Sequence, residues 1–373
     1  MDHSNLQKYG VPIYASGWVP SGVIQSQTGD DTEGSYYAVL AGGGGEGRSG
    51  IPNAVLICHF NFRSNSLSQE PVAKLGLGSD LPYRVVVHPG GDGILCALPN
   101  RCQFYDWDRD EVDKKITLNL KDSEKSLVQL ENIEQQLSLA FSNDSSVLAT
   151  GGEDGKLRVF KWPSMEVIIE KPDAHPSVKD LCFSLDGKLL VSLGRSSGTV
   201  WDISTSKSIA PISKEQDEVF ISCKFSQFQD NTPILYIAGI KGNFGFIQSW
   251  NVNSWTKIKS KKIPCENVSS FDVSPDGNHL AIGTSQGDVL LVSADNMKVH
   301  TSIKKAHIGI VTTLAFSHDS RVLITASMDS SARVAKVVAQ KRNEGGLSFW
   351  MIFLVALLAI VAFFIERLFD YLL

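Results

Sequence analysis

The sequence lacks several features that assign many proteins to a functional class. Its formal net charge is −5, and no basic stripe with interleaved aromatic residues is present, which argues against a general nucleic-acid binder. None of its six cysteines belongs to a C-x-x-C pair, and most lie in apolar runs. We therefore expect buried, reduced thiols of a cytosolic domain rather than disulfides or zinc ligands.

Motifs of covalent catalysis are also missing. The chain has no G-x-S-x-G elbow, no H-E-x-x-H pair and no two carboxylates fixed by spacing. Its eight histidines are scattered along the chain. We predict that the protein is not an enzyme of covalent chemistry.

Long apolar runs are absent with one exception near the C-terminus. Residues 347–365 form 19 consecutive positions without a charge, enough for a helix of about 28 Å. Four basic residues precede this run, namely Arg333, Lys336, Lys341 and Arg342, whereas only Arg367 follows it. The positive-inside rule then places the large N-terminal part in the cytosol. We predict a juxtamembrane linker at 341–346, a transmembrane helix at 347–365 and a short lumenal tail at 366–373.

Helical periodicity is almost absent before this run, and a weak repeat takes its place. An apolar strand that ends in an aromatic or β-branched residue followed by serine recurs at Phe141-Ser142, Phe183-Ser184, Phe225-Ser226, Val273-Ser274 and Phe316-Ser317. The intervals between these sites are 42, 42, 48 and 43 residues. Each site is followed by a polar turn, a strand of small residues, a second turn and a third strand.

Strand, turn and strand at this period are typical of WD-type β-propeller blades. Trp201-Asp202 is the dipeptide that names the class, and His175 and His307 stand at blade-opening positions, where a structural role is the more frequent one. We predict an all-β fold, a seven-bladed propeller over residues 1–340, followed by a single C-terminal transmembrane helix. We expect residues 11–19 to supply the strand that closes the ring, and residues 116–133 to form a strand connection rather than a helix.

One segment departs from the repeat. Residues 41–53, here called the glycine loop, read A-G-G-G-G-E-G-R-S-G-I-P-N and contain six glycines in the nine positions from Gly42 to Gly50. Ordering glycine loses more conformational entropy than ordering any other residue, so such a loop usually serves a close backbone approach. Apolar, strand-like runs flank it on both sides.

Three interpretations of the glycine loop compete. A phosphate-binding loop would need a helix directly after it, whereas Gly50 and Pro52 are followed by a strand-like run. A flexible hairpin tip is the second interpretation. The third is a specialised loop that surrounds a cation with carbonyl groups or presents Ile51 to a partner. The ordered ending Ile51-Pro52-Asn53 favours this third interpretation, because Pro52 restricts Ile51 and Asn53 can bond back into the loop.

A propeller, a C-terminal span and this loop together resemble the Sec-twelve family, whose animal relative is the prolactin regulatory element-binding protein. The resemblance covers the whole chain, but only the glycine loop is specific to it. It implies a guanine-nucleotide exchange factor, anchored in the endoplasmic reticulum, that activates a Sar-type small GTPase and so starts coat protein complex II (COPII) assembly and transport to the Golgi. The short tail suggests a plant-type member.

The resemblance also implies a site. The expected partners are the Sar-type GTPase, GDP-bound or nucleotide-free, and the endoplasmic reticulum membrane, with no nucleic acid and a monomeric propeller. The implied contact residues are Gly42, Gly43, Gly44, Gly45, Glu46, Gly47, Gly50, Ile51, Pro52 and Asn53, with Pro82 and His307 as secondary candidates. The implied cofactor is a potassium ion, held mainly by the carbonyls of Ala41, Gly42, Gly43, Gly44 and Asn53.

Asn53 matches the family's functional asparagine, and we expect it to order the loop or to contact the GTPase. The alternative function is that of a trafficking facilitator or scaffold in the endoplasmic reticulum that exports specific membrane proteins without exchange activity. Such a paralogue could lose the glycine loop, and this chain keeps it.

Overall fold

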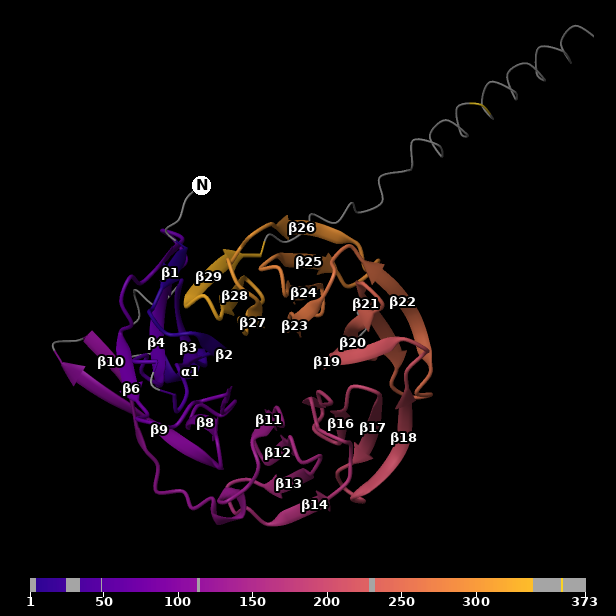
Figure 1. The fold of residues 1–373 in the computed structure, drawn as a ribbon, viewed down its shortest axis with the longest axis horizontal. Coiled ribbons are helices and arrows are strands. Elements are labelled where there is room, and N and C mark those ends of the chain that lie inside the picture. The colour runs from indigo at the N-terminus through magenta and orange to yellow at the C-terminus, as the bar shows by residue number, and fades with distance from the viewer. Residues whose placement is uncertain are drawn as a thin grey trace, which may run out of the picture. The chain divides into compact units, whose positions relative to one another are not determined.

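The fold is a ring of seven antiparallel sheets, as predicted (Figure 1). The computed structural model describes residues 5–24, 34–47, 49–112, 115–227, 232–337 and Leu357. The chain divides into two compact units, residues 1–337 and residues 338–373. Every described strand belongs to the first unit, which is therefore an all-β, seven-bladed propeller.

The blades follow one another along the chain, and each runs from the central channel to the rim. Blade 1 contains β2 (Ile13–Trp18), β3 (Ser35–Gly42), β4 (Ala54–Asn61), β5 (Ser66–Leu67) and β6 (Ala73–Gly76). Blade 2 contains β7 (Arg84–Val87), β8 (Gly93–Leu98), β9 (Arg101–Val112) and β10 (Lys115–Asp122), and blade 3 contains β11 (Gln136–Phe141), β12 (Val147–Gly152), β13 (Leu157–Lys161) and β14 (Val167–Lys171). Blade 4 contains β15 (Asp180–Phe183), β16 (Leu189–Leu193), β17 (Ser197–Asp202) and β18 (Lys207–Ser213).

The remaining blades complete the ring. Blade 5 contains β19 (Glu218–Gln227), β20 (Pro233–Lys241), β21 (Phe244–Asn251) and β22 (Lys257–Ile263), and blade 6 contains β23 (Val268–Val273), β24 (His279–Thr284), β25 (Val289–Ser293) and β26 (Val299–Ile303). Blade 7 contains β27 (Val311–Phe316), β28 (Val322–Ser327), β29 (Ser331–Lys336) and the N-terminal β1 (Leu6–Lys8). Two short helical turns lie between strands, α1 (Ser21–Ile24) and η1 (Val128–Leu130).

The recurring serine of the repeat builds the turn after the innermost strand. In four blades its hydroxyl donates to an aspartate two residues later, at Ser142–Asp144, Ser184–Asp186, Ser274–Asp276 and Ser317–Asp319. The same oxygen accepts a hydrogen bond from the backbone N–H five residues after it. One side chain thus closes the turn from both ends, which explains why serine and aspartate recur at this spacing.

Ring closure differs from the prediction. The strand that completes blade 7 is β1, which pairs with β29 through Leu6 opposite Arg333. The segment 11–19 instead provides β2, the innermost strand of blade 1. β1 has only three residues and no apolar alternation, so the outer edge of blade 7 selects a partner that the sequence pattern does not reveal.

Seven apolar clusters hold the blades together, one between each pair of neighbours. Between blades 1 and 7, for example, Ile13 and Leu56 pack with Val322 and Ile324. Each such side chain contributes about 1.5–3 kcal/mol on full burial.

The predicted strand connection at 116–133 contains most of β10 followed by η1 and no α-helix.

The predicted linker, transmembrane helix and tail lie outside the described residues, apart from Leu357. Within the part of the chain that the structure describes, no helix is both long and apolar enough to cross a membrane.

Candidate functional site

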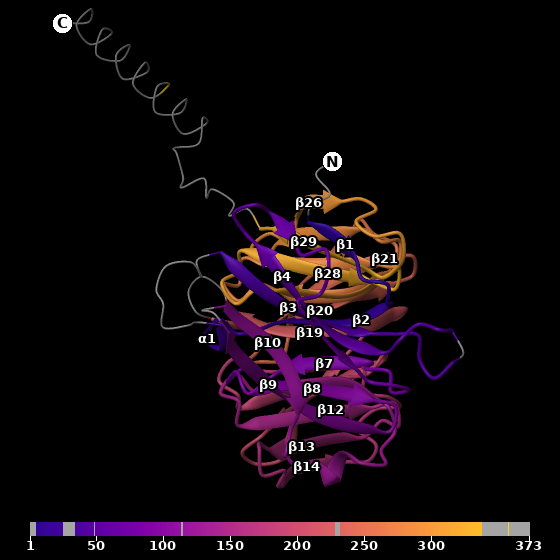
Figure 2. The ribbon, with the colours of Figure 1, turned by 90° about the vertical axis from the view of Figure 1, so that its left-hand side faces the viewer.

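The glycine loop connects the second and third strands of blade 1. β3 ends at Gly42 and β4 begins at Ala54, so residues 43–53 form the tip of this hairpin. Figure 2 shows the hairpin projecting from one face of the propeller, beyond its neighbouring loops. We call this the loop face. A strand, and not a helix, follows the loop, so the context that a phosphate-binding loop requires is missing here.

Asn53 ties the base of the glycine loop together. Its side chain is 2% exposed. Its Oδ1 accepts a hydrogen bond from the Gly45 N–H at 2.9 Å, and its Nδ2 donates to the carbonyl oxygens of Gly45 and Gly78 at 3.2 and 3.1 Å. Three bonds from one buried amide therefore fix the turn at Gly45 and join it to the segment that follows β6.

The first three glycines of the loop lie where no side chain fits. A Cβ on Gly42 would stand 1.9 Å from the Pro12 carbonyl oxygen, and one on Gly43 would stand 2.2 Å from Asn53 Oδ1. Gly43 also has a φ of +152°, a conformation that favours glycine, and its N–H donates to the Pro12 carbonyl at 2.9 Å. The glycines therefore permit a close packing of backbone on backbone, which a merely flexible hairpin tip would not need.

The outer part of the loop is exposed. Glu46, Gly47, Gly50 and Pro52 face solvent, and Ile51 is 38% exposed. A Cβ on Gly47 or Gly50 would meet no atom within 4 Å. The loop thus combines an ordered base with an accessible tip that carries an apolar side chain, an acidic side chain and a proline.

A cation site at the loop base would have to draw on backbone oxygens. Among the described residues no group of three or more His, Cys, Asp or Glu side chains is arranged to hold a metal ion. Ala41 and Gly42 lie in β3, which pairs with β2 on one side and β4 on the other, so their backbone groups belong to a central strand. Gly43 and Gly44 follow the strand, and Gly43 lies beside the buried Asn53 side chain. These oxygens fit the chemistry of potassium, which accepts neutral carbonyl ligands.

The two secondary candidates differ in their surroundings. Pro82 is buried just before β7, in the segment that leaves Gly78, the residue bonded to Asn53. His307 is 3% exposed, and its two ring nitrogens contact the hydroxyls of Ser331 and Thr325 at 2.6 and 2.8 Å. Burial lowers the pKa of His307 to about 4, so the ring is neutral at physiological pH. The structure therefore agrees with a structural role for His307 inside blade 7. The side chain is too buried for an exposed contact with a partner.

Two residues of the loop's surroundings were not identified from the sequence. Pro12 and Gly78 supply the carbonyl oxygens that receive the Gly43 N–H and the Asn53 Nδ2. Any residue type offers such a carbonyl, so no side-chain signal could have predicted them.

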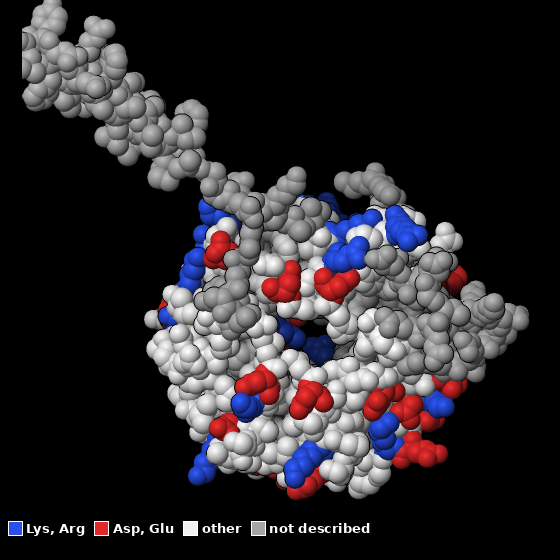
Figure 3. All heavy atoms as spheres, turned by 180° about the vertical axis from the view of Figure 1, so that it is seen from behind, with Lys and Arg blue, Asp and Glu red and all other residues white. Residues whose placement is uncertain are grey.

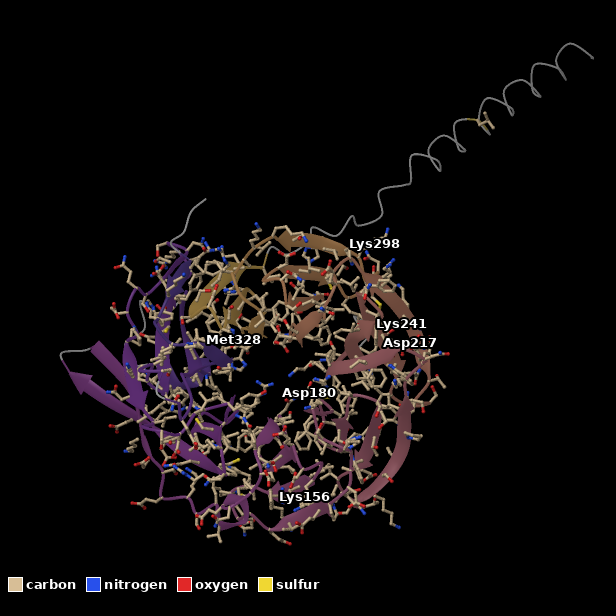
Figure 4. The ribbon with its side chains drawn as sticks, viewed as in Figure 1. Lys156, Asp180, Asp217, Lys241, Lys298 and Met328 are labelled. Atoms are coloured by element: carbon tan, nitrogen blue, oxygen red, sulfur yellow. The ribbon has the colours of Figure 1, made fainter. Side chains whose placement is uncertain are left out.

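A second cluster of polar groups lines the central channel. Asp180, labelled in Figure 4, accepts hydrogen bonds from the hydroxyls of Ser138 and Ser222, on the innermost strands of the two flanking blades. Lys224 lies 3.9 Å from Asp272. Burial would lower the pKa of Lys224, but the neighbouring carboxylates outweigh it and raise that pKa. Figure 3 shows the channel opening on the face opposite the glycine loop. The hydrogen bonds of Asp180 tie blade 4 to blades 3 and 5.

Comparison with known proteins agrees with the propeller. The family model described as WD domain, G-beta repeat matches residues 132–161 and 298–335. The chain is 44% identical to SEC12-like protein 2 of Arabidopsis thaliana over 361 residues, which cover 93% of this chain and 91% of that protein. It is 29% identical to SEC12-like protein 1 of the same plant, over 85% of this chain and 80% of that protein.

A more distant relative carries a functional name. The chain is 23% identical to guanine nucleotide-exchange factor SEC12 of Mus musculus, over 74% of this chain and 78% of that protein. The extent and level of the match to the first plant protein are decisive for the family. This chain, a seven-bladed propeller with a glycine-rich hairpin on blade 1, belongs to the SEC12-like proteins.

Proposed function

We propose that this protein is a guanine-nucleotide exchange factor for a Sar-type small GTPase, which acts at the endoplasmic reticulum to start COPII coat assembly. The observation that carries the proposal is the glycine loop, which projects from blade 1 with an ordered base and an exposed tip. The exchange-factor name of the mouse relative supports the same activity. The potassium dependence, the membrane anchor and the choice of GTPase belong to the proposal.

Exchange requires no bond chemistry from the protein. The factor binds the nucleotide-free GTPase more tightly than the GDP-bound form, and this difference in affinity favours GDP release. GTP, once bound, favours dissociation of the factor by the same linkage.

Each part of the loop has a separate task in this proposal. Ile51, Pro52 and Glu46 stand at the exposed tip, where they would contact the GTPase. Asn53 is buried, and its side-chain amide is hydrogen-bonded to Gly45 and Gly78. These contacts support a role in ordering the loop over direct contact with the GTPase. A rigid tip loses less entropy on binding than a flexible one, which raises affinity for the state that it fits.

Potassium would be held at the loop base by the carbonyls of Gly43 and Gly44 together with Asn53. Its chemistry there is that of a spherical cation that offsets the repulsion between convergent carbonyl dipoles. The carbonyls of Ala41 and Gly42 are less suited to this task, because they belong to the central strand of the blade.

Anchoring would restrict the activity to one membrane. The apolar run 347–365 would span the endoplasmic reticulum membrane as a single helix, with the propeller in the cytosol and the tail 366–373 in the lumen. The linker 341–346 would then join the propeller to this anchor.

GDP release from a Sar-type GTPase tests the proposal. The full-length protein in liposomes should accelerate release, and Asn53→Ala should abolish most of the acceleration while the propeller stays folded. Asn143→Ala is a matched control, because Asn143 also donates a side-chain bond to a backbone carbonyl but in a turn outside the glycine loop. No acceleration by the folded wild-type protein would favour the facilitator or scaffold alternative.

A further inference from the structure

Blade 7 presents an apolar side chain that packing does not explain. Ile308, in the loop before β27, is 84% exposed, the highest value among the exposed large apolar side chains of the described residues. Met328, in the hairpin between β28 and β29, is 47% exposed. We call these two residues the blade 7 patch.

The backbone beneath the patch is held in place. The Asp329 carboxylate accepts hydrogen bonds from the Ile308 N–H at 2.6 Å and the Gly309 N–H at 3.4 Å. Its other oxygen accepts from the Ser331 N–H at 2.9 Å. Burial alone would raise the pKa of Asp329, but the hydrogen bonds from Ser331 and Ile308 outweigh it and lower that pKa to about 2. The carboxylate therefore stays ionised and joins the two loops, so Ile308 is presented by an ordered segment.

The patch lies on the loop face, in the blade next to the glycine loop. Three hydrogen bonds join β2 to β27. They link Ile13 to Thr312, Ser16 to Thr313 and Trp18 to Ala315, so residue numbers rise together along the two strands. The two innermost strands are therefore parallel. Because both blades are antiparallel meanders, the β28–β29 hairpin and the β3–β4 hairpin emerge on the same face. Figure 4 shows Met328 at the inner edge of blade 7, beside blade 1.

We infer that the surface contacted by the GTPase continues from Ile51 on the glycine loop onto the blade 7 patch. The inference rests on the proposed function. It adds a second contact surface for the GTPase to the one that the glycine loop provides. Single exposed apolar residues are common, but two on linked and ordered loops, beside a third at the tip of the exchange loop, indicate one interface. A loop of eleven residues is also smaller than a usual protein interface, which needs about 20–30 residues on each side.

Exposed apolar residues outside blades 1 and 7 provide controls. Val128, in η1 between blades 2 and 3, is 64% exposed. Leu185 is 41% exposed in the turn after β15, at the opposite end of its blade from the loop face. Aspartate in place of either residue removes an exposed apolar side chain and adds one negative charge, as it does at Ile308.

The test measures release of a fluorescent GDP analogue from a Sar-type GTPase by the full-length protein in liposomes. Ile308→Asp should reduce exchange efficiency at least tenfold, with the half-saturating GTPase concentration raised, as for the loss of an interface hot spot. Val128→Asp and Leu185→Asp should stay within about twofold of wild type, a difference well below such a loss. Thermal melting should be the same for all, because the replaced side chains are exposed. Met328→Asp provides a second variant of the patch and should act in the same direction.

The outcomes separate the two proposals. If wild type accelerates release and Asn53→Ala does not, but Ile308→Asp and Met328→Asp behave as wild type, the exchange function stands and the blade 7 contact is wrong. An equal loss with Val128→Asp would likewise overturn the assignment to blade 7. If wild type itself gives no acceleration, the proposed function fails, and the patch inference fails with it.

Discussion

Gly43 and Gly47 form a matched pair that tests whether the loop geometry matters. Gly43 has a φ of +152°, and an added Cβ would stand 2.2 Å from Asn53 Oδ1 and 2.5 Å from Asn53 Cα. Holding alanine in such a conformation costs about 1–3 kcal/mol, and overpacking costs about 1–3 kcal/mol more. Gly43→Ala therefore destabilises the closed loop by about 2–6 kcal/mol in total.

Gly47→Ala makes the same chemical change without these costs. An added Cβ there meets no atom within 4 Å, and Gly47 does not have a positive φ. Its effect should stay within about 1 kcal/mol, and a small stabilisation is expected because alanine restricts the unfolded chain more than glycine does.

Two measurements compare the pair. Hydrogen exchange of the Gly45 amide, which is bonded to Asn53 Oδ1, reports loop closure. GDP release from the Sar-type GTPase reports function. Gly43→Ala should lose amide protection and slow exchange at least tenfold, since each 1.4 kcal/mol corresponds to about a factor of ten. Equal behaviour of the two variants, with both propellers folded, would show that the loop is a flexible tip and would refute the reasoning.

Three further predictions concern the ion, the pH and the thiols. Replacing potassium by lithium or tetramethylammonium at constant ionic strength should lower exchange activity and Gly45 protection; if neither changes, the ion has no role, and the exchange proposal stands without it. Burial lowers the pKa of His307 to about 4, so the unfolded chain binds this proton first as the pH falls. The free energy of unfolding should then decrease between about pH 6.5 and 4, by on the order of 3 kcal/mol from this residue, and equal urea midpoints at pH 7 and 4.5 would contradict it. Cys265 is only partly buried whereas the other five cysteines are buried, so it should be alkylated first in the native protein, as mass spectrometry can show.

Much of the architecture follows from local chemistry. In four blades, the serine that follows the innermost strand and the aspartate two residues later build a turn from their own side chains. Such bonds are local in sequence, so their spacing is visible without a structure. Blade 2 could be predicted in the same way from the strand pattern around Leu95 and Phe104, although it lacks the serine.

Ring closure could not be predicted in this way. β1 is recruited by the unpaired edge of β29, and its partner residues are more than 300 positions away in sequence. A three-residue strand carries too little pattern to identify, whereas the stronger apolar run at 13–18 is needed at the centre of blade 1. The choice between these segments depends on which one the closed ring brings beside the free edge.

For the candidate site, the sequence by itself determined the glycine loop and its interruption of two strands, because six glycines in nine positions depart from any blade pattern. Only the tertiary structure decided what the loop's residues do. It buries Asn53 against Gly45 and Gly78, and it buries His307 inside blade 7. It also exposes Ile308 on the neighbouring blade. Burial and exposure depend on neighbours that are distant in the chain, and no local pattern contains them.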